Sequence, residues 1–111
     1  MRQTYNSQPD VISEIRSTGI ITTVFRIDIT QTEDGYECDE VEYNHREPLT
    51  EDDYGPMVTA LIRLRYSADE MEALLNNYVA SKTTEHKAEW NTMQAWRTEA
   101  KRLARLALDG I

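Results

Sequence analysis

The chain has 111 residues, enough for one domain, and its 40% hydrophobic and 29% charged residues exclude wholesale disorder. No apolar run approaches the ~20 residues of a membrane-spanning helix, and the first ten residues lack the apolar core of a signal peptide, so we expect a cytoplasmic protein without membrane contact. The net charge of −8 is uneven, because residues 1–60 carry four basic and 13 acidic groups and residues 61–111 carry eight and seven. This distribution makes nucleic acid an unlikely general partner and permits head-to-tail association between copies.

Residues 1–19 are predicted to form a polar N-terminal arm that precedes the folded domain. Within it, Gln8-Pro9-Asp10 favours the start of a short helical turn. Such a turn places three apolar side chains on one side, those of Val11, Ile12 and Ile15. The segment ends at Gly19.

Residues 20–45 predict a β-hairpin. The first strand alternates apolar with polar residues, which is typical of a strand with one buried face, and its apolar members are Ile21, Phe25, Ile27 and Ile29. Glu33-Asp34-Gly35 marks the turn, because Asp-Gly accepts the positive φ angles of a tight reversal. In the return strand the apolar phase slips by one at Asp39-Glu40, which predicts a β-bulge there.

Three helices are predicted to follow, over residues 50–66, 68–81 and 84–109. Thr50 is a candidate N-cap for the first, and Ser67-Ala68-Asp69-Glu70 is a capping box that starts the second. Apolar residues at helical spacing predict a buried stripe on the second helix, formed by Met71, Leu74, Leu75, Tyr78 and Val79.

The last helix is the longest periodic segment. Thr83 or Thr84 is its candidate N-cap, and Gly110 is its candidate stop. Its apolar stripe consists of Met93, Trp96, Ala100, Leu103 and Ala107. We expect Trp90, Met93 and Trp96 to cover the hairpin, with Trp96 as a core anchor against the hairpin or the second helix. The predicted fold class is α+β, an antiparallel β-hairpin packed on a three-helix layer with a long C-terminal helix, as a single domain over residues 20–111.

Motifs that commit a chain to a reaction are missing from the sequence. There is no Gly-rich phosphate loop, GxSxG, HExxH or paired CxxC. His45 and His86 are far apart and expected at the surface, and Cys38 lies beside acids that raise a thiol pKa, so we expect no cofactor, no metal site and no enzyme. The acidic return strand is interpreted as edge-protecting charge, although a cation site there and a catalytic site assembled from scattered residues remain alternatives.

Four basic residues gather in the second half of the last helix, and they are Arg97, Lys101, Arg102 and Arg105. They form either a solvated face or the contact surface for an anionic partner. We expect a non-enzymatic interaction or assembly protein with a protein partner, possible self-association included. The alternative is a nucleic-acid-associated regulator that uses these four side chains.

Four stretches carry a resemblance to known sequences, and they are FRIDI (25–29), CDEV (38–41), ALIRLRYSADEMEALLNNY (60–78) and QAWRTEAKRLA (94–104). Together they resemble small uncharacterised proteins encoded among structural and tail genes in prophages of gut bacteria. The resemblance is one of general pattern over most of residues 8–105 and carries no assigned site residues. It implies a phage-derived accessory or assembly role, with virion association as the alternative to a cytoplasmic location.

Overall fold

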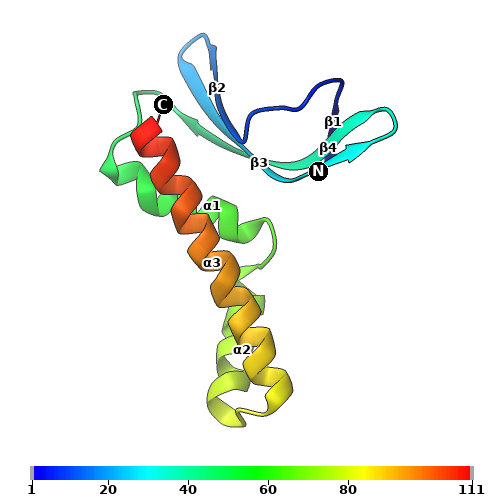
Figure 1. Cartoon of the computed structure of the whole chain (residues 1–111). Coiled ribbons are helices and arrows are strands. Elements are labelled where there is room, and N and C mark those ends of the chain that lie inside the picture. Colours follow the sequence, from blue (N-terminus) through cyan, green and yellow to red (C-terminus); the bar gives the residue numbers. More distant parts are fainter. Residues whose placement is uncertain (1, 111) are drawn as a thin grey trace.

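The computed structural model describes residues 2–110 and contains a four-stranded antiparallel sheet and three α-helices (Figure 1). The elements are β1 (Arg2–Tyr5), β2 (Ile12–Ser17), β3 (Ile20–Thr32), β4 (Gly35–His45), a 3₁₀ turn (Glu51–Asp53), α1 (Tyr54–Arg63), α2 (Ala68–Ala80) and α3 (Thr84–Gly110). The strand order in the sheet is β1-β4-β3-β2. The predicted α+β class and the long C-terminal helix are therefore confirmed.

The N-terminal segment differs from the predicted polar arm, because its described part forms two edge strands. β1 pairs antiparallel with β4, and β2 pairs antiparallel with β3, so the predicted hairpin is the centre of a larger sheet. Edge strands are held by backbone hydrogen bonds and need little apolar alternation. In β2, Ile12 packs on the core while Ile15 is 54% exposed, and their spacing of three imitates a helical pattern.

The register of β3 and β4 contains a β-bulge, but the extra residue belongs to β3. Ile27 pairs with Asp39 and Thr30 pairs with Glu37, so three steps along β3 match two along β4. Asp28, inside the bulge, has a φ of +54°. A left-handed residue at this point is typical of a bulge and increases the local twist.

The bulge predicted at Asp39-Glu40 is wrong, since residues 39–43 of β4 pair one to one with β3. The phase slip in the sequence has another origin. Cys38 and Val41 are both buried although they lie three residues apart, and therefore on opposite faces of a regular strand. The sheet is thus covered on both faces near these positions.

The main core lies between one face of the sheet and two helices. Phe25, Ile27 and Val41 form its sheet side. α1 and the second half of α3 form its helical side, through Met57, Val58, Leu61, Ile62, Trp96, Ala100, Leu103, Ala104 and Ala107. All five residues of the predicted α3 stripe are buried.

The two tryptophans have different neighbours. Trp96 is a core anchor as predicted, and its indole N–H donates to the carbonyl of Leu61 on α1 at 3.1 Å. Trp90 does not cover the hairpin, because its ring stacks on Tyr78 of α2 with centroids 5.2 Å apart. The cover of the sheet therefore comes from the second half of α3 together with α1, and the sequence did not assign α1 to that role.

The helix starts follow local chemistry. Ser67 and Glu70 form the predicted capping box of α2, with the Glu70 N–H donating to Ser67 Oγ at 3.1 Å and the Ser67 N–H donating to the Glu70 carboxylate at 3.0 Å. At the start of α3, Thr83 Oγ1 accepts a bond from the His86 N–H at 3.2 Å. The predicted helix 50–66 divides into the 3₁₀ turn and α1.

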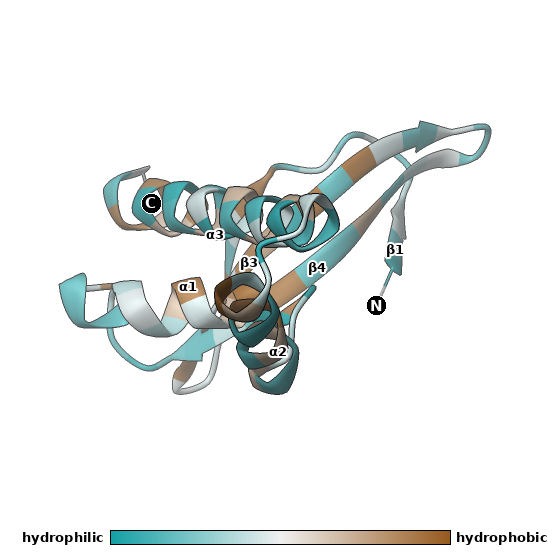
Figure 2. Ribbon diagram, turned by 90° about the horizontal axis from the view of Figure 1, so that it is seen from below, coloured by the Kyte–Doolittle hydropathy of each residue, from teal (hydrophilic) through white to brown (hydrophobic). Residues whose placement is uncertain are grey.

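α2 and the first half of α3 extend away from the sheet as a helical arm, a name kept below for residues 68–95 (Figure 1). The radius of gyration is 16.2 Å. A compact domain of this length is expected to have about 13 Å, so the arm makes the molecule extended. Apolar segments occur on α2 as well as on the central strands and α1 (Figure 2).

Candidate interaction surfaces

Arg105, one of the four predicted contact residues, reaches the acidic front half of the chain. Its guanidinium lies 2.6 Å from the Glu51 carboxylate and 4.7 Å from the ring centroid of Tyr54. The hydrogen bond lowers the pKa of Glu51 and raises the pKa of Arg105. The opposite charges of the two halves meet here within one chain, so this part of the charge distribution says little about a partner.

The other three basic residues lie along the same helix in different surroundings. Arg102 pairs with Glu99 one turn earlier at 2.5 Å, and this bond lowers the pKa of Glu99. Arg97 and Lys101 are exposed, and within residues 2–110 neither forms an ion pair. Two of the four cations are thus neutralised by acids of their own chain.

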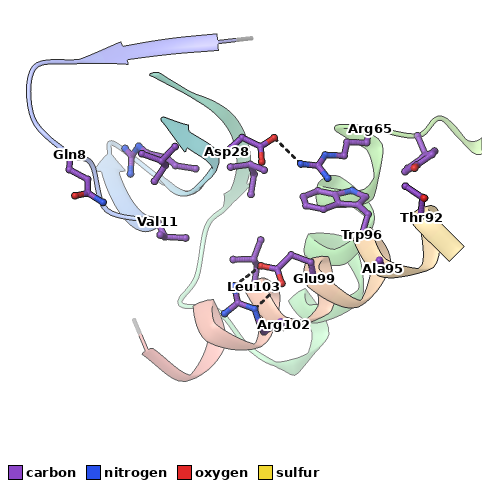
Figure 3. A pocket seen from close by; sticks show the side chains of 14 residues that line it. Gln8, Val11, Asp28, Arg65, Thr92, Ala95, Trp96, Glu99, Arg102 and Leu103 are labelled. Carbon is purple, nitrogen blue, oxygen red and sulfur yellow. Dashed lines mark hydrogen bonds and ion pairs between the residues drawn. The ribbon is translucent and has the colours of Figure 1, made fainter. Parts of the chain in front are cut away.

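An open groove of about 750 Å³ runs between the β3 bulge and α3 (Figure 3). Trp96, Ile27 and Leu103 contribute apolar lining, and the Arg65 guanidinium lies 3.9 Å from the centroid of the Trp96 ring. The charged lining residues are paired within the chain, Arg65 with Asp28, Arg102 with Glu99, and Arg26 with Glu40. The groove therefore offers an apolar floor but few polar groups free for a ligand.

A cluster of polar side chains forms around Arg26 on the sheet face opposite the helices. Its guanidinium donates to Glu40 at 2.8 Å, to Tyr5 Oη at 3.2 Å, to Ser13 Oγ at 2.8 Å and to the Asp10 carbonyl at 2.9 Å. Burial lowers the pKa of Arg26, but the bonds to Tyr5 and Glu40 outweigh it and the pKa is raised. Arg26 thus ties all four strands and the segment before β2 together, which is a structural task.

The metal-ligating and nucleophilic side chains of the described residues are dispersed or buried. Within residues 2–110 no group of three or more His, Cys, Asp or Glu side chains converges to hold a metal ion. Cys38 is fully buried, and burial together with the charge of Glu40 raises the pKa of its thiol. His45 is half-buried and not freely exposed, with Nε2 bonded to Thr23 Oγ1 at 2.8 Å.

Across residues 2–110, no helix combines the length and the apolar character needed to span a bilayer.

The exposed apolar side chains of α2 are the feature that the fold explains least. The predicted buried stripe is wrong for Leu75 and Val79, which are 45% and 65% exposed, whereas Met71, Leu74 and Tyr78 are half-buried. None of the α2 residues is buried. We use the name α2 stripe for the exposed positions that share one face at steps of four, three and four, namely Ala68, Glu72, Leu75 and Val79.

The spacing of the five residues in the predicted stripe did not separate the exposed positions from the half-buried ones, because a broad apolar stripe is also typical of a helix that faces the core. Two of the other exposed apolar side chains belong to the sheet. Ile15 and Ile20 lie on the sheet face that points away from the helices, and Ile15 is paired across the strands with Thr22. The two side chains are diagonal neighbours on that face, and a pair of exposed apolar residues is ordinary on a protein surface.

Comparisons of the chain with models of protein families, with curated proteins and with solved structures gave no match in any of the three.

Proposed function

We propose that this chain is a non-enzymatic interaction protein that binds a protein partner through the α2 stripe. The observation that carries the proposal is the exposure of Leu75 and Val79, one turn apart on a helix without a single buried residue. An amphipathic helix that presents apolar residues at i and i+4 is a common mode of helix recognition. The arm holds this helix away from the sheet, where another chain reaches it (Figure 1).

The energetics set a condition on the partner. Full burial of a Leu or Val side chain stabilises by about 1.5–3 kcal/mol, and about half of that remains available at each of these two positions. Association costs at least about 4 kcal/mol in lost freedom of motion. The partner must therefore also cover the half-buried edges of Met71 and Tyr78, which adjoin the stripe.

The biological setting that we propose is an accessory or assembly role in a phage-derived system. The support for this setting is the sequence resemblance to small prophage proteins, and α2 is part of its longest matching stretch, residues 60–78. Assembly proteins act by binding and not by turnover. The α2 stripe, made of apolar side chains and one acidic side chain, is a surface suited to binding.

Nucleic-acid binding is the weaker candidate. Arg102 and Arg105 are paired with Glu99 and Glu51, so the basic half of α3 offers fewer free cations than its sequence indicates. Binding to duplex DNA at low salt that is lost steeply as salt rises would favour this candidate over the proposed one.

The test is affinity capture with a tagged chain from a lysate of the native host. The Leu75→Ser/Val79→Ser variant removes the apolar part of the stripe, and Ile15→Ser/Ile20→Ser removes two comparably exposed side chains elsewhere. The proposal predicts a bound protein, a second copy of this chain included, that the first variant loses and the control retains. Equal capture by wild type and both variants would contradict it.

A further inference from the structure

We infer that the protein bound by the α2 stripe is a second copy of this chain, with the two α2 helices packed antiparallel. This inference rests on the proposed function, because it uses the same surface and names its occupant. Its basis is that the stripe is complementary to itself in an antiparallel arrangement, in shape and in charge.

The register follows from the spacing of the apolar pair. An antiparallel contact centred near Asn77 places Leu75 opposite Val79 of the second copy, and Val79 opposite its Leu75. The same register brings Glu72 to the level of the link that follows α2 in the second copy, where Lys82 lies two residues beyond the last residue of the helix. A twofold axis repeats every contact, so one small patch supplies both halves of the interface, as in most homodimers.

The charges of Glu72, within the stripe, and of Lys82, just beyond the end of α2, are available for this pairing. Glu72 and Lys82 are exposed, and neither forms an ion pair within residues 2–110. Lys82 has a φ of +45° in the link after α2, and its ammonium lies 5.5 Å from the ring centroid of Tyr78. The ammonium is therefore held beside the C-terminal end of α2, next to the stripe.

The charges at the ends of α2 also favour the antiparallel arrangement. Asp69 and Glu70 lie in the first turn of α2, where acids are favourable, and no basic residue lies in its last turn. Antiparallel packing places the acidic first turn of one α2 near Lys82 of the other copy. A parallel arrangement would instead place the two acidic first turns side by side.

The size of the contact indicates a weak dimer. α2 has 13 residues, which corresponds to a length of about 20 Å. One helix pair of this length buries less than the roughly 1,600 Å² of a standard stable interface, so the dimer is expected to be transient. α2 lies at the end of the arm farthest from the sheet, so two copies meet there without contact between their sheets (Figure 1).

The experiment is sedimentation velocity at low salt over rising protein concentration, with charge reversals on the full chain. Glu72→Lys and Lys82→Glu each turn two attractive contacts into two repulsive ones, and each should weaken dimerisation about tenfold or more. The double variant restores opposite charges and should recover dimerisation to within about threefold of wild type. Glu89→Lys and Lys87→Glu, at exposed sites on α3, are the matched controls and should dimerise as wild type.

Three results would overturn the inference: a wild type that stays monomeric at every concentration, single reversals without effect, or a double variant that fails to recover. Thermal melts of each variant show whether a loss of association comes from unfolding. If the wild type is monomeric but its capture of another protein still depends on Leu75 and Val79, a second copy is excluded as the partner of the stripe. The proposed function then remains intact. If that capture is also independent of the stripe, both proposals fail.

Discussion

The indole of Trp96 is both a packing group and a hydrogen-bond donor. Its ring is buried in the core cluster, its N–H donates to the Leu61 carbonyl at 3.1 Å, and Arg65 stacks on its outer side. The Leu61 carbonyl also accepts from the Leu64 N–H at 3.2 Å, so the loss of the indole bond does not leave it without a donor. Packing should therefore dominate the contribution of Trp96 to stability.

Substitutions at Trp96 separate the two contributions. Trp96→Ala should lower the free energy of unfolding by about 3–5 kcal/mol, as large aromatic truncations in cores do. Trp96→Phe keeps most of the packing and should cost only about 1–2 kcal/mol. Urea unfolding followed by circular dichroism measures both. A Trp96→Ala variant as stable as wild type would show that the ring is not part of the core.

The Tyr43 hydroxyl donates to the Asp53 carboxylate at 2.7 Å, and burial, followed by this bond, raises the pKa of Tyr43 to about 12. An unfolded tyrosine titrates near 10, so the folded state keeps its proton at a pH where the unfolded state loses it. The stability from Tyr43 is thus complete below about pH 10 and is lost as pH rises toward about 12.

The free energies of unfolding of wild type and Tyr43→Phe, measured with urea, should therefore differ less at alkaline pH than at neutral pH. The stability advantage of wild type at about pH 8 should shrink by about 1–2 kcal/mol by about pH 11. An advantage that is unchanged or larger at the higher pH would mean that the pKa of Tyr43 is not raised in the folded state.

Among the elements, β1 depends on a close approach at the turn of the central hairpin. Gly35 has a φ of +140°, and a Cβ placed on it would collide with the backbone carbonyl oxygen of Tyr5. Gly19 also has a positive φ, of +74°, but open space surrounds it. The two glycines therefore distinguish backbone strain alone from strain combined with a clash against β1.

Gly35→Ala should destabilise the chain by more than Gly19→Ala, which should cost about 1 kcal/mol from its backbone conformation alone. Displacement of β1 should also expose Cys38, which pairs with Gln3 of β1. The rate of thiol labelling under native conditions should then rise in Gly35→Ala and stay low in Gly19→Ala. Equal labelling rates in the two variants would contradict this role of Gly35.

The elements that the sequence predicted well are those specified by neighbouring residues. The Ser67 capping box sets the start of α2, and Asp34-Gly35 sets the hairpin turn, because both signals act within a few residues. β1 and β2 were missed because edge strands depend on partners far along the chain. Their sequences, RQTY and ISEIRS, show no clean alternation of their own.

The candidate site was less predictable than the fold. Periodicity correctly placed Met71, Leu74, Leu75, Tyr78 and Val79 on one broad side of a helix, but it contains no information about what lies opposite. Similarly, the sequence showed that the second half of α3 is basic. It did not show that Arg105 and Arg102 form ion pairs with Glu51 and Glu99. Which surfaces stay open is a property of tertiary structure.

At the scale of the whole molecule, the sheet and the α1–α3 core form a compact part, and the arm extends from it. The core buries sixteen apolar side chains in residues 2–110, yet none of them belongs to α2. A helix held only by half-buried contacts is expected to open locally more easily than the core helices. Contact with a second chain should therefore stabilise α2 more than any other element.

Methyl NMR with a soluble paramagnetic agent tests the central claim, that another copy covers the α2 stripe, most directly. Spectra are recorded at low micromolar and at near-millimolar protein concentration. The account predicts that the methyl signals of Leu75 and Val79 shift and become protected from the agent as concentration rises, while those of Ile15 and Ile20 stay exposed. Leu75 and Val79 methyl groups that remain equally accessible at both concentrations would contradict it.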